Sequence, residues 1–262
     1  MEEKINLHVH STISDGKKTP DEIVDMMEKN NVLFSLTDHD NISGNFIVTN
    51  LIQNKKLFIT GCEFTSSVTR DFPINFEIHL LAYDFNLNEI KPHFIERDKL
   101  IQNDLDHVKK LLKQEKNYDY CKTFTELNDE LSVDYSKTKA NSMIRELRTL
   151  KELCAKEVID LVHGCGGMVF LAHPYNVLHN KSKMKISEKE IENLIQFLIT
   201  IGLDGIESHY YNYNNEQVEF LSDISKKYNL LQSSGVDNHF KNDGEPFYQK
   251  NKKIFSWLNK ED

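Results

Sequence analysis

The stretch "INLHVHSTISDG", residues 5–16, alternates apolar and polar side chains over its first half. In a β-strand the apolar residues would lie on one face, and His8 and His10 would lie on the other. Two imidazoles two residues apart on a strand can bind one cation together. The stretch therefore predicts a first strand at 5–9 that ends in a metal-binding pair.

Six more short runs have the composition of strands, and segments of helical period separate most of them. Residues 19–22 and 187–190 carry the capping-box pattern that opens a helix. This alternation predicts an α/β fold with a mostly parallel sheet, either open or closed into a barrel. The six further strands are expected at 32–36, 57–61, 76–83, 168–172, 205–208 and 230–234.

One interval breaks the alternation, because more than 80 residues separate the fourth predicted strand from the fifth. Residues 95–115 have the pattern of a charged amphipathic helix, and the segment up to about 150 is polar with few strand signals. We therefore expect one domain built from 1–90 and 151–262. Residues 91–150 are expected to form a small helical insert that covers the site.

Composition excludes several classes of protein. Hydrophobic residues make up 39% of the 262 residues, and the formal net charge is −9. A negative charge of this size argues against binding of long nucleic acid or an anionic membrane, since both need a basic face. The sequence has no long apolar run and no signal-peptide pattern, and its four cysteines are scattered. These features predict reduced thiols and a cytoplasmic protein.

Metal-competent side chains gather where the predicted strands end. Ligands of parallel α/β proteins bind at the carboxyl ends of the strands, so these side chains should meet at one edge. Imidazoles together with carboxylates suit zinc, manganese and iron, and their number favours several ions that share a bridging carboxylate. Such a site suggests hydrolysis of a phosphate ester. The side chains are His8, His10, Asp38, His39, Asp40, Glu63, His79, His173, Glu207, His209, Asp237 and His239.

The ordered set H-x-H…D, T-D-H-D, G-x-E, H, A-H-P and D-x-H resembles the PHP (polymerase and histidinol phosphatase) phosphoesterase family over roughly residues 4–94 and 155–240. Within that family the chain looks most like small bacterial members that hydrolyse nucleotides or nucleoside bisphosphates. The resemblance implies a distorted (β/α)7 barrel. It also implies two or three divalent ions, Mn²⁺, Fe²⁺ or Zn²⁺, and attack on phosphorus by a metal-bridged hydroxide.

The resemblance also implies which residues bind each ion. The first ion would take His8, His10, Glu63 and Asp237. The second would share Glu63 and add His79 and His173. The third would use Asp15, His39 and His239, and without that ion Asp15 and His39 would act as an acid–base pair. We also expect Asp38 and Asp40, which flank His39, to orient imidazole N–H groups; an ordinary loop role for these aspartates is equally open.

The substrate pocket departs from the family pattern. Nucleotide-hydrolysing relatives carry an Arg-x-His stretch in the insert, followed by another arginine, where this chain has Lys139, Asn141 and Ile144. Lysine keeps the positive charge but lacks the two-pronged hydrogen bonding of arginine. The candidate substrate contacts are Lys139, Arg145, His209 and Tyr210.

The function expected from these observations is metal-dependent hydrolysis of a small phosphomonoester, a nucleotide or nucleoside bisphosphate. Two alternatives keep the same chemistry: a 3′–5′ exonuclease on short oligonucleotides and a histidinol-phosphatase. A third alternative is an inactive, metal-bound structural or binding module. The sequence leaves the oligomeric state open.

Overall fold

The computed structural model describes residues 4–68, 76–112, 118–150, 152–179, 182–240 and 255–258. The chain divides into two compact units. The first joins Met1–Ile90 to Leu153–Asp262, and the second is Lys91–Glu152.

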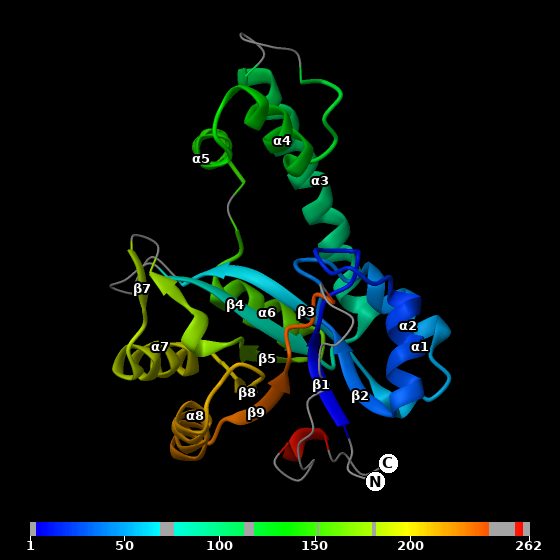
Figure 1. Ribbon diagram of the computed structural model, residues 1–262, viewed down its shortest axis with the longest axis vertical. Coiled ribbons are helices and arrows are strands. Elements are labelled where there is room, and N and C mark those ends of the chain that lie inside the picture. The colour runs from blue at the N-terminus through cyan, green and yellow to red at the C-terminus, as the bar shows by residue number, and fades with distance from the viewer. Residues whose placement is uncertain are drawn as a thin grey trace. The chain divides into compact units, whose positions relative to one another are not determined.

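The first unit is built around a sheet with the strand order β1-β2-β3-β4-β5-β8-β9 (Figure 1). The sheet almost closes on itself, because the segment after β9 pairs with the end of β1. The Asn238 amide donates to the His8 carbonyl across 3.1 Å, and the His10 amide donates to the Asn238 carbonyl across 2.9 Å. The expected α/β barrel-like fold is therefore confirmed. The strands of this path are β1 (Lys4–Val9), β2 (Val32–Leu36), β3 (Phe58–Ser67), β4 (Phe76–Tyr83), β5 (Met168–Leu171), β8 (Gly205–Tyr210) and β9 (Leu231–Gly235).

Close approach of β9 to β1 requires a glycine. A Cβ atom added to Gly235 would lie 2.3 Å from the Cβ atom of His8 and 2.5 Å from Glu207 Oε1. No side chain fits in that space, so glycine at the end of β9 allows the barrel to close beside the histidines.

The sheet differs from the expected pattern in three ways. β4 runs antiparallel to both β3 and β5, whereas the other neighbouring strands of the path are parallel. Pairing with β4 extends β3 as far as Ser67. Glu63 therefore lies within the strand, whereas the strand expected from the sequence at 57–61 would place it after the strand end. A short hairpin of β6 (Leu178–His179) and β7 (Ser182–Lys185), which the sequence analysis missed, pairs with β4.

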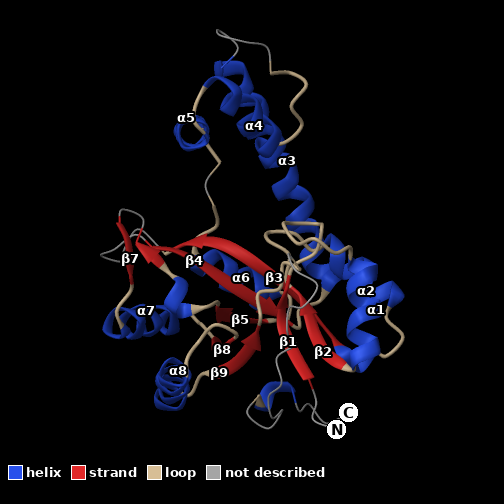
Figure 2. Cartoon of the chain, viewed as in Figure 1, coloured by secondary structure: helices blue, strands red, loops and turns tan. Residues whose placement is uncertain are grey.

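Helices lie around the strands of this unit (Figure 2). Both predicted capping boxes are confirmed: Thr19 caps the first helix with Glu22, and Ser187 caps another with Glu190. These boxes satisfy amide groups that a helix start would otherwise leave unpaired. The helices are α1 (Pro20–Asn30), α2 (Ser43–Leu51), α6 (Ala155–Gly164), α7 (Glu188–Thr200) and α8 (Asn215–Tyr228).

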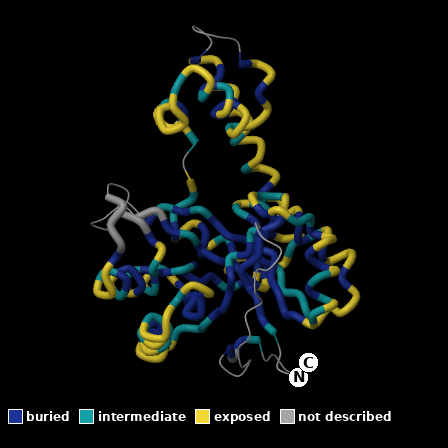
Figure 3. The backbone as a smooth tube through the Cα atoms, in the orientation of Figure 1, coloured by how far each residue is buried: buried dark blue, intermediate teal, exposed yellow. Residues whose placement is uncertain are grey.

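Apolar side chains fill both the barrel and the space under its helices, and Figure 3 shows the strands buried beneath exposed outer helix faces. Ile5 and Leu7 of β1 pack in one cluster with Tyr83, Phe170 and Trp257. The alternation in the first strand thus directs its apolar side chains into the core and turns its histidines toward a separate, polar cluster.

The second unit has a hydrophobic core of its own, in which Leu105 and Val108 of one helix pack with Leu127 and Ile144 of the others. Its helices are α3 (Leu87–Leu112), which begins in the first unit, α4 (Phe124–Asp134) and α5 (Lys137–Leu147). In the described part of the chain, no helix combines the length and the apolar character needed to cross a membrane.

Candidate metal centre

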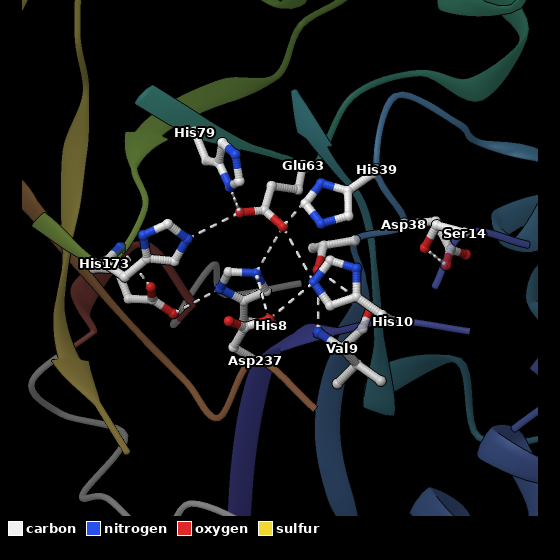
Figure 4. A network of polar contacts seen from close by, with 12 residues as sticks. His8, Val9, His10, Ser14, Asp38, His39, Glu63, His79, His173 and Asp237 are labelled. Atoms are coloured by element: carbon white, nitrogen blue, oxygen red, sulfur yellow. Dashed lines mark hydrogen bonds and ion pairs between the residues drawn. The ribbon is translucent and has the colours of Figure 1, made fainter. Parts of the chain in front are cut away.

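Histidines and carboxylates from six strands and their following loops meet in one cluster (Figure 4). Three groups within it could each hold a metal ion, because their ligand atoms lie within 4.8 Å of one another. The first group is His8, His10, Glu63 and Asp237, the second is His39, Glu63 and His79, and the third is His10, Asp15, His39 and His239. The first group is the set that the resemblance assigns to the first ion. The other two differ from the assigned sets, because His39 takes the place of His173 in the second group and His10 joins the third.

Glu63 lies at the centre of this cluster, and it is 1% exposed. Its Oε2 atom is 3.0 Å from His8 Nε2 and 3.1 Å from His10 Nε2. Its Oε1 atom is 2.8 Å from His79 Nδ1 and 3.1 Å from His173 Nε2. One carboxylate therefore faces two pairs of imidazoles, which is the arrangement expected of a ligand that two cations share.

Several buried nitrogens of the cluster have no hydrogen-bond partner among the described residues. These include both ring nitrogens of His10, Nδ1 of His39 and Nδ1 of His173. His10 Nε2 is 3.1 Å from both Glu63 Oε2 and Asp237 Oδ1, but the angles are not those of a hydrogen bond. Buried polar atoms are normally paired. Imidazole nitrogens without a hydrogen-bond partner that face carboxylate oxygens are the arrangement expected where a cation binds between the two kinds of ligand.

The electrostatics of the cluster point in the same direction. Burial would lower the pKa of His10, but the adjacent carboxylates of Asp237 and Glu63 outweigh it and raise the pKa to about 9. Burial would raise the pKa of Glu63, yet the charge of His8 and the neighbouring imidazoles hold it well below its usual range. Protons on the imidazoles thus balance the carboxylates where a cation would otherwise do so, and metal binding would release them.

The more exposed side of the cluster carries the third group. Asp15 is 55% exposed, and its Oδ2 atom is 3.0 Å from His239 Nε2. Its Oδ1 atom is 4.0 Å from Nε2 of His39, whose side chain is 27% exposed. Burial lowers the pKa of His39 to about 4, so its ring is neutral at physiological pH, the form that binds metals.

Glu207 orients His8, a role that the sequence analysis did not assign to it. The fully buried Glu207 carboxylate accepts from His8 Nδ1 across 3.1 Å and from the His173 backbone amide across 2.8 Å. Because a carboxylate can only accept, Nδ1 of His8 donates to Glu207, and by the same argument Nε2 donates to Glu63 Oε2 across 3.0 Å. Metal binding would displace the Nε2 proton and leave Nδ1–H on Glu207. Its place near the end of the strand expected at 205–208 was the signal that could have identified it, although β8 extends to Tyr210.

The expected orienting role of Asp38 is wrong. Asp38 accepts instead from the backbone amide and hydroxyl of Ser11 and from the hydroxyl of Ser14, each across 2.7 Å. It therefore fixes the loop that leads from β1 to Asp15. Asp40 accepts from the Thr65 backbone amide across 3.2 Å.

Comparison with known families identifies this arrangement. The family model of the PHP domain matches residues 6–207, which span β1 to β8. The chain belongs to the PHP domain family. Membership, the barrel and the clustered histidines and carboxylates together make it a metal-dependent phosphoesterase.

Relatives of this PHP chain agree with the fold. A Haemophilus influenzae protein named 5′-3′ exoribonuclease is 26% identical over an alignment that covers 92% of this chain and 91% of that protein. A crystal structure described as a metal-dependent phosphoesterase, from Bifidobacterium adolescentis, covers 96% of this chain and 94% of its own with 22% identity and a TM-score of 0.66. An amidohydrolase structure from Chromobacterium violaceum covers 90% of this chain and 87% of its own, with 21% identity and a TM-score of 0.58.

The candidate substrate contacts of the PHP barrel lie in different surroundings. Tyr210 joins the cluster, where its hydroxyl donates to Asp237 Oδ2 across 3.0 Å. His209 is buried away from those ligands, with its ring edge-on to Phe255 at 5.7 Å between centroids. Glu207 and His209, two residues apart on β8, would normally point to the same face of the sheet. A register shift between them in the pairing of β8 with β9 directs His209 away from the face that carries Glu207.

The other two candidates belong to the helical unit. The ammonium group of Lys139 lies 4.7 Å from the centroid of the Tyr135 ring. Arg145 lines a cavity of about 610 Å³ within that unit, together with Lys137, Arg148 and Phe124. Contact of Lys139 or Arg145 with a substrate stays a prediction, as does covering of the site by the insert.

Replacement of Glu207 by glutamine should weaken metal binding. The amide oxygen of glutamine can still accept from His8 Nδ1–H but carries no negative charge, so it fixes the proton and the orientation of the ring more weakly. We expect the dissociation constant for Mn²⁺, measured by calorimetric titration, to rise about 10–100-fold in Glu207→Gln. An unchanged constant would show that His8 does not depend on this partner.

Proposed function

We propose that this PHP phosphoesterase hydrolyses the phosphate ester of a nucleotide or nucleoside bisphosphate with two or three bound divalent ions. The observation that carries the proposal is Glu63, which lies between two pairs of imidazoles. Shared carboxylates of this kind are typical of centres in which two metals act on one phosphoryl group.

The first of the three groups, His8, His10, Glu63 and Asp237, would hold the first ion. For the other two ions we follow the family resemblance, with Glu63, His79 and His173 at the second and Asp15, His39 and His239 at the third. His173 Nε2 lies 3.1 Å from Glu63 Oε1, which supports its place at the second ion. Manganese, iron and zinc suit such mixtures of nitrogen and oxygen ligands. When bound, the ions would neutralise phosphoryl oxygens and provide a nucleophile at neutral pH.

The protein's own groups would then handle orientation and protons. Glu207 keeps His8 in one orientation, and Asp38 holds the loop that carries Asp15. Asp15 and His39 occupy the exposed side of the cluster, where a leaving group can reach solvent. We infer that these two residues share the proton taken up by the leaving oxygen, unless a third ion performs that task.

Substitution of Asp15 tests this assignment. In Asp15→Asn we expect the turnover of a nucleoside monophosphate to fall by about 10²-fold or more, because its alkoxide leaving group needs a proton. Turnover of p-nitrophenyl phosphate should fall much less, because p-nitrophenolate leaves without one. Equal losses on both substrates would assign Asp15 to metal binding alone.

Short RNA is a second candidate substrate, and the printed name of the Haemophilus influenzae relative favours it. The net charge of −9 disfavours long nucleic acid but permits a short end of one. The relative's name specifies 5′-3′ degradation, whereas the exonuclease expected from the sequence runs 3′–5′.

A substrate panel with Mn²⁺-loaded protein separates these possibilities. The panel contains nucleoside monophosphates, nucleoside bisphosphates, histidinol phosphate, and short RNAs labelled at either the 5′ or the 3′ end. Phosphate release from the small molecules without shortening of RNA supports the proposed function. Mononucleotides released from one RNA end would identify an exonuclease and its direction. If no substrate is turned over, the alternative of an inactive, metal-bound module is favoured.

A further inference from the structure

Tyr210, the last residue of β8, contacts a member of the cluster through its hydroxyl. That hydroxyl donates to Asp237 Oδ2 across 3.0 Å, and the residue is 6% exposed. The other oxygen of Asp237, Oδ1, lies 3.1 Å from His10 Nε2 and 3.6 Å from His8 Nε2. The carboxylate is thus divided, with one oxygen facing the imidazoles and the other facing the phenol.

The segment that carries Asp237 is strained as well as fixed. Asp237 has a φ of 55°, in the left-handed region that costs free energy for a residue with a side chain. The backbone of the next residue, Asn238, is bonded to His8 and His10 on β1. These bonds fix the main chain, but they do not fix the rotation of the carboxylate, for which Oδ2 needs a partner.

Aromatic neighbours hold the Tyr210 ring. It lies edge-on to His173 at 5.8 Å between centroids and against Tyr213 at 5.1 Å. Tyr213 in turn accepts a hydrogen bond from the Tyr175 backbone amide across 2.9 Å. Because the ring has little room to move, its hydroxyl is a rigid donor to the carboxylate.

We propose that Tyr210 is a positioning residue that orients Asp237 for metal binding, and that the substrate does not contact it. The inference rests on the proposed function, in which Asp237 is a metal ligand. A hydrogen bond to Oδ2 holds Oδ1 toward the imidazoles, so the ligand is prepared before the ion arrives. A hydrogen-bond partner of a metal ligand affects the metal affinity directly, and it affects turnover only because less metal is bound.

The variant Tyr210→Phe removes only the hydroxyl. We expect the dissociation constant for Mn²⁺, measured by calorimetric titration, to rise about 10–100-fold. At saturating Mn²⁺ the KM of the substrate should not change. Tyr228→Phe is the matched control, because the Tyr228 hydroxyl also donates to a carboxylate, Glu192 Oε1 at 2.6 Å, between the outer helices α7 and α8. It should leave Mn²⁺ affinity unchanged.

A double-mutant cycle with Asp237→Asn shows whether Tyr210 acts through Asp237. If it does, Tyr210→Phe causes little further loss of Mn²⁺ affinity once Asp237 is replaced. The same fold loss in both backgrounds overturns the inference, and so does a raised KM with unchanged Mn²⁺ affinity. Failure of the wild-type protein to bind Mn²⁺ overturns both this inference and the proposed ligand set, whereas normal binding by wild type and Tyr210→Phe alike overturns the inference alone.

Discussion

Glu63→Gln is expected to reduce phosphate release by at least about 10³-fold, since loss of several kcal/mol of transition-state stabilisation corresponds to that factor. The substitution keeps the shape of the side chain but removes the negative charge that five imidazoles face. No other carboxylate in the described part of the cluster faces both imidazole pairs. Both proposed ion sites that share this residue should therefore weaken together.

Stability must be measured beside activity, because removing one partner of buried charge pairs typically destabilises a protein by about 3–5 kcal/mol. The rates are therefore compared at a temperature at which circular dichroism shows Glu63→Gln to be folded. Glu219→Gln, on the exposed surface of α8, is the matched control and should retain wild-type turnover. A folded Glu63→Gln protein with a near-normal rate would refute a shared carboxylate.

Removal of divalent ions is expected to abolish turnover and to lower the thermal midpoint. Buried imidazoles and carboxylates that face one another lose their cation, and only protons then balance the charge. Returning Mn²⁺ to about 100 times its dissociation constant should stabilise the folded protein by about 2.7 kcal/mol. The experiment is a melting curve and a rate assay after chelation and again after Mn²⁺ is restored.

Glu63→Gln serves as the control for this second prediction. Its melting temperature should respond much less to Mn²⁺ than that of the wild-type protein, since the stabilisation depends on the ligands. Turnover that persists in chelated protein, or equal stabilisation of both proteins, would contradict metal binding in this cluster.

Much of the site could be predicted because periodicity and strand ends carry the information. His8 and His10 alternate with core residues, so their shared face follows from the geometry of a strand. Strand–helix alternation then directs the loops after β2, β5 and β9 to the same edge. His39, His173 and Asp237 reach the cluster for that reason.

What could not be predicted depends on long-range pairing. The antiparallel course of β4 and the extension of β3 past Glu63 arise from contact between those two strands. The register shift in β8 reverses the alternation expected after Glu207, and it directs His209 toward Phe255. Local sequence does not specify these features, because each depends on a partner strand.

Hydrogen-bond partners of the ligands were the least predictable part. Asp38 lies beside His39 in sequence but binds the loop around Ser11. Glu207, 199 residues from His8 in the chain, orients that imidazole instead. Which carboxylate faces an imidazole depends on side-chain direction in the closed barrel, and the distance along the chain gives no guide to it.

The most direct test of the metal centre is a crystal structure of the protein grown with Mn²⁺, with anomalous scattering recorded above the manganese absorption edge. We predict one peak among His8, His10, Glu63 and Asp237, and a second among Glu63, His79 and His173. Absence of a peak beside Glu63, in crystals whose Mn²⁺ concentration saturates the phosphatase activity, would contradict the account.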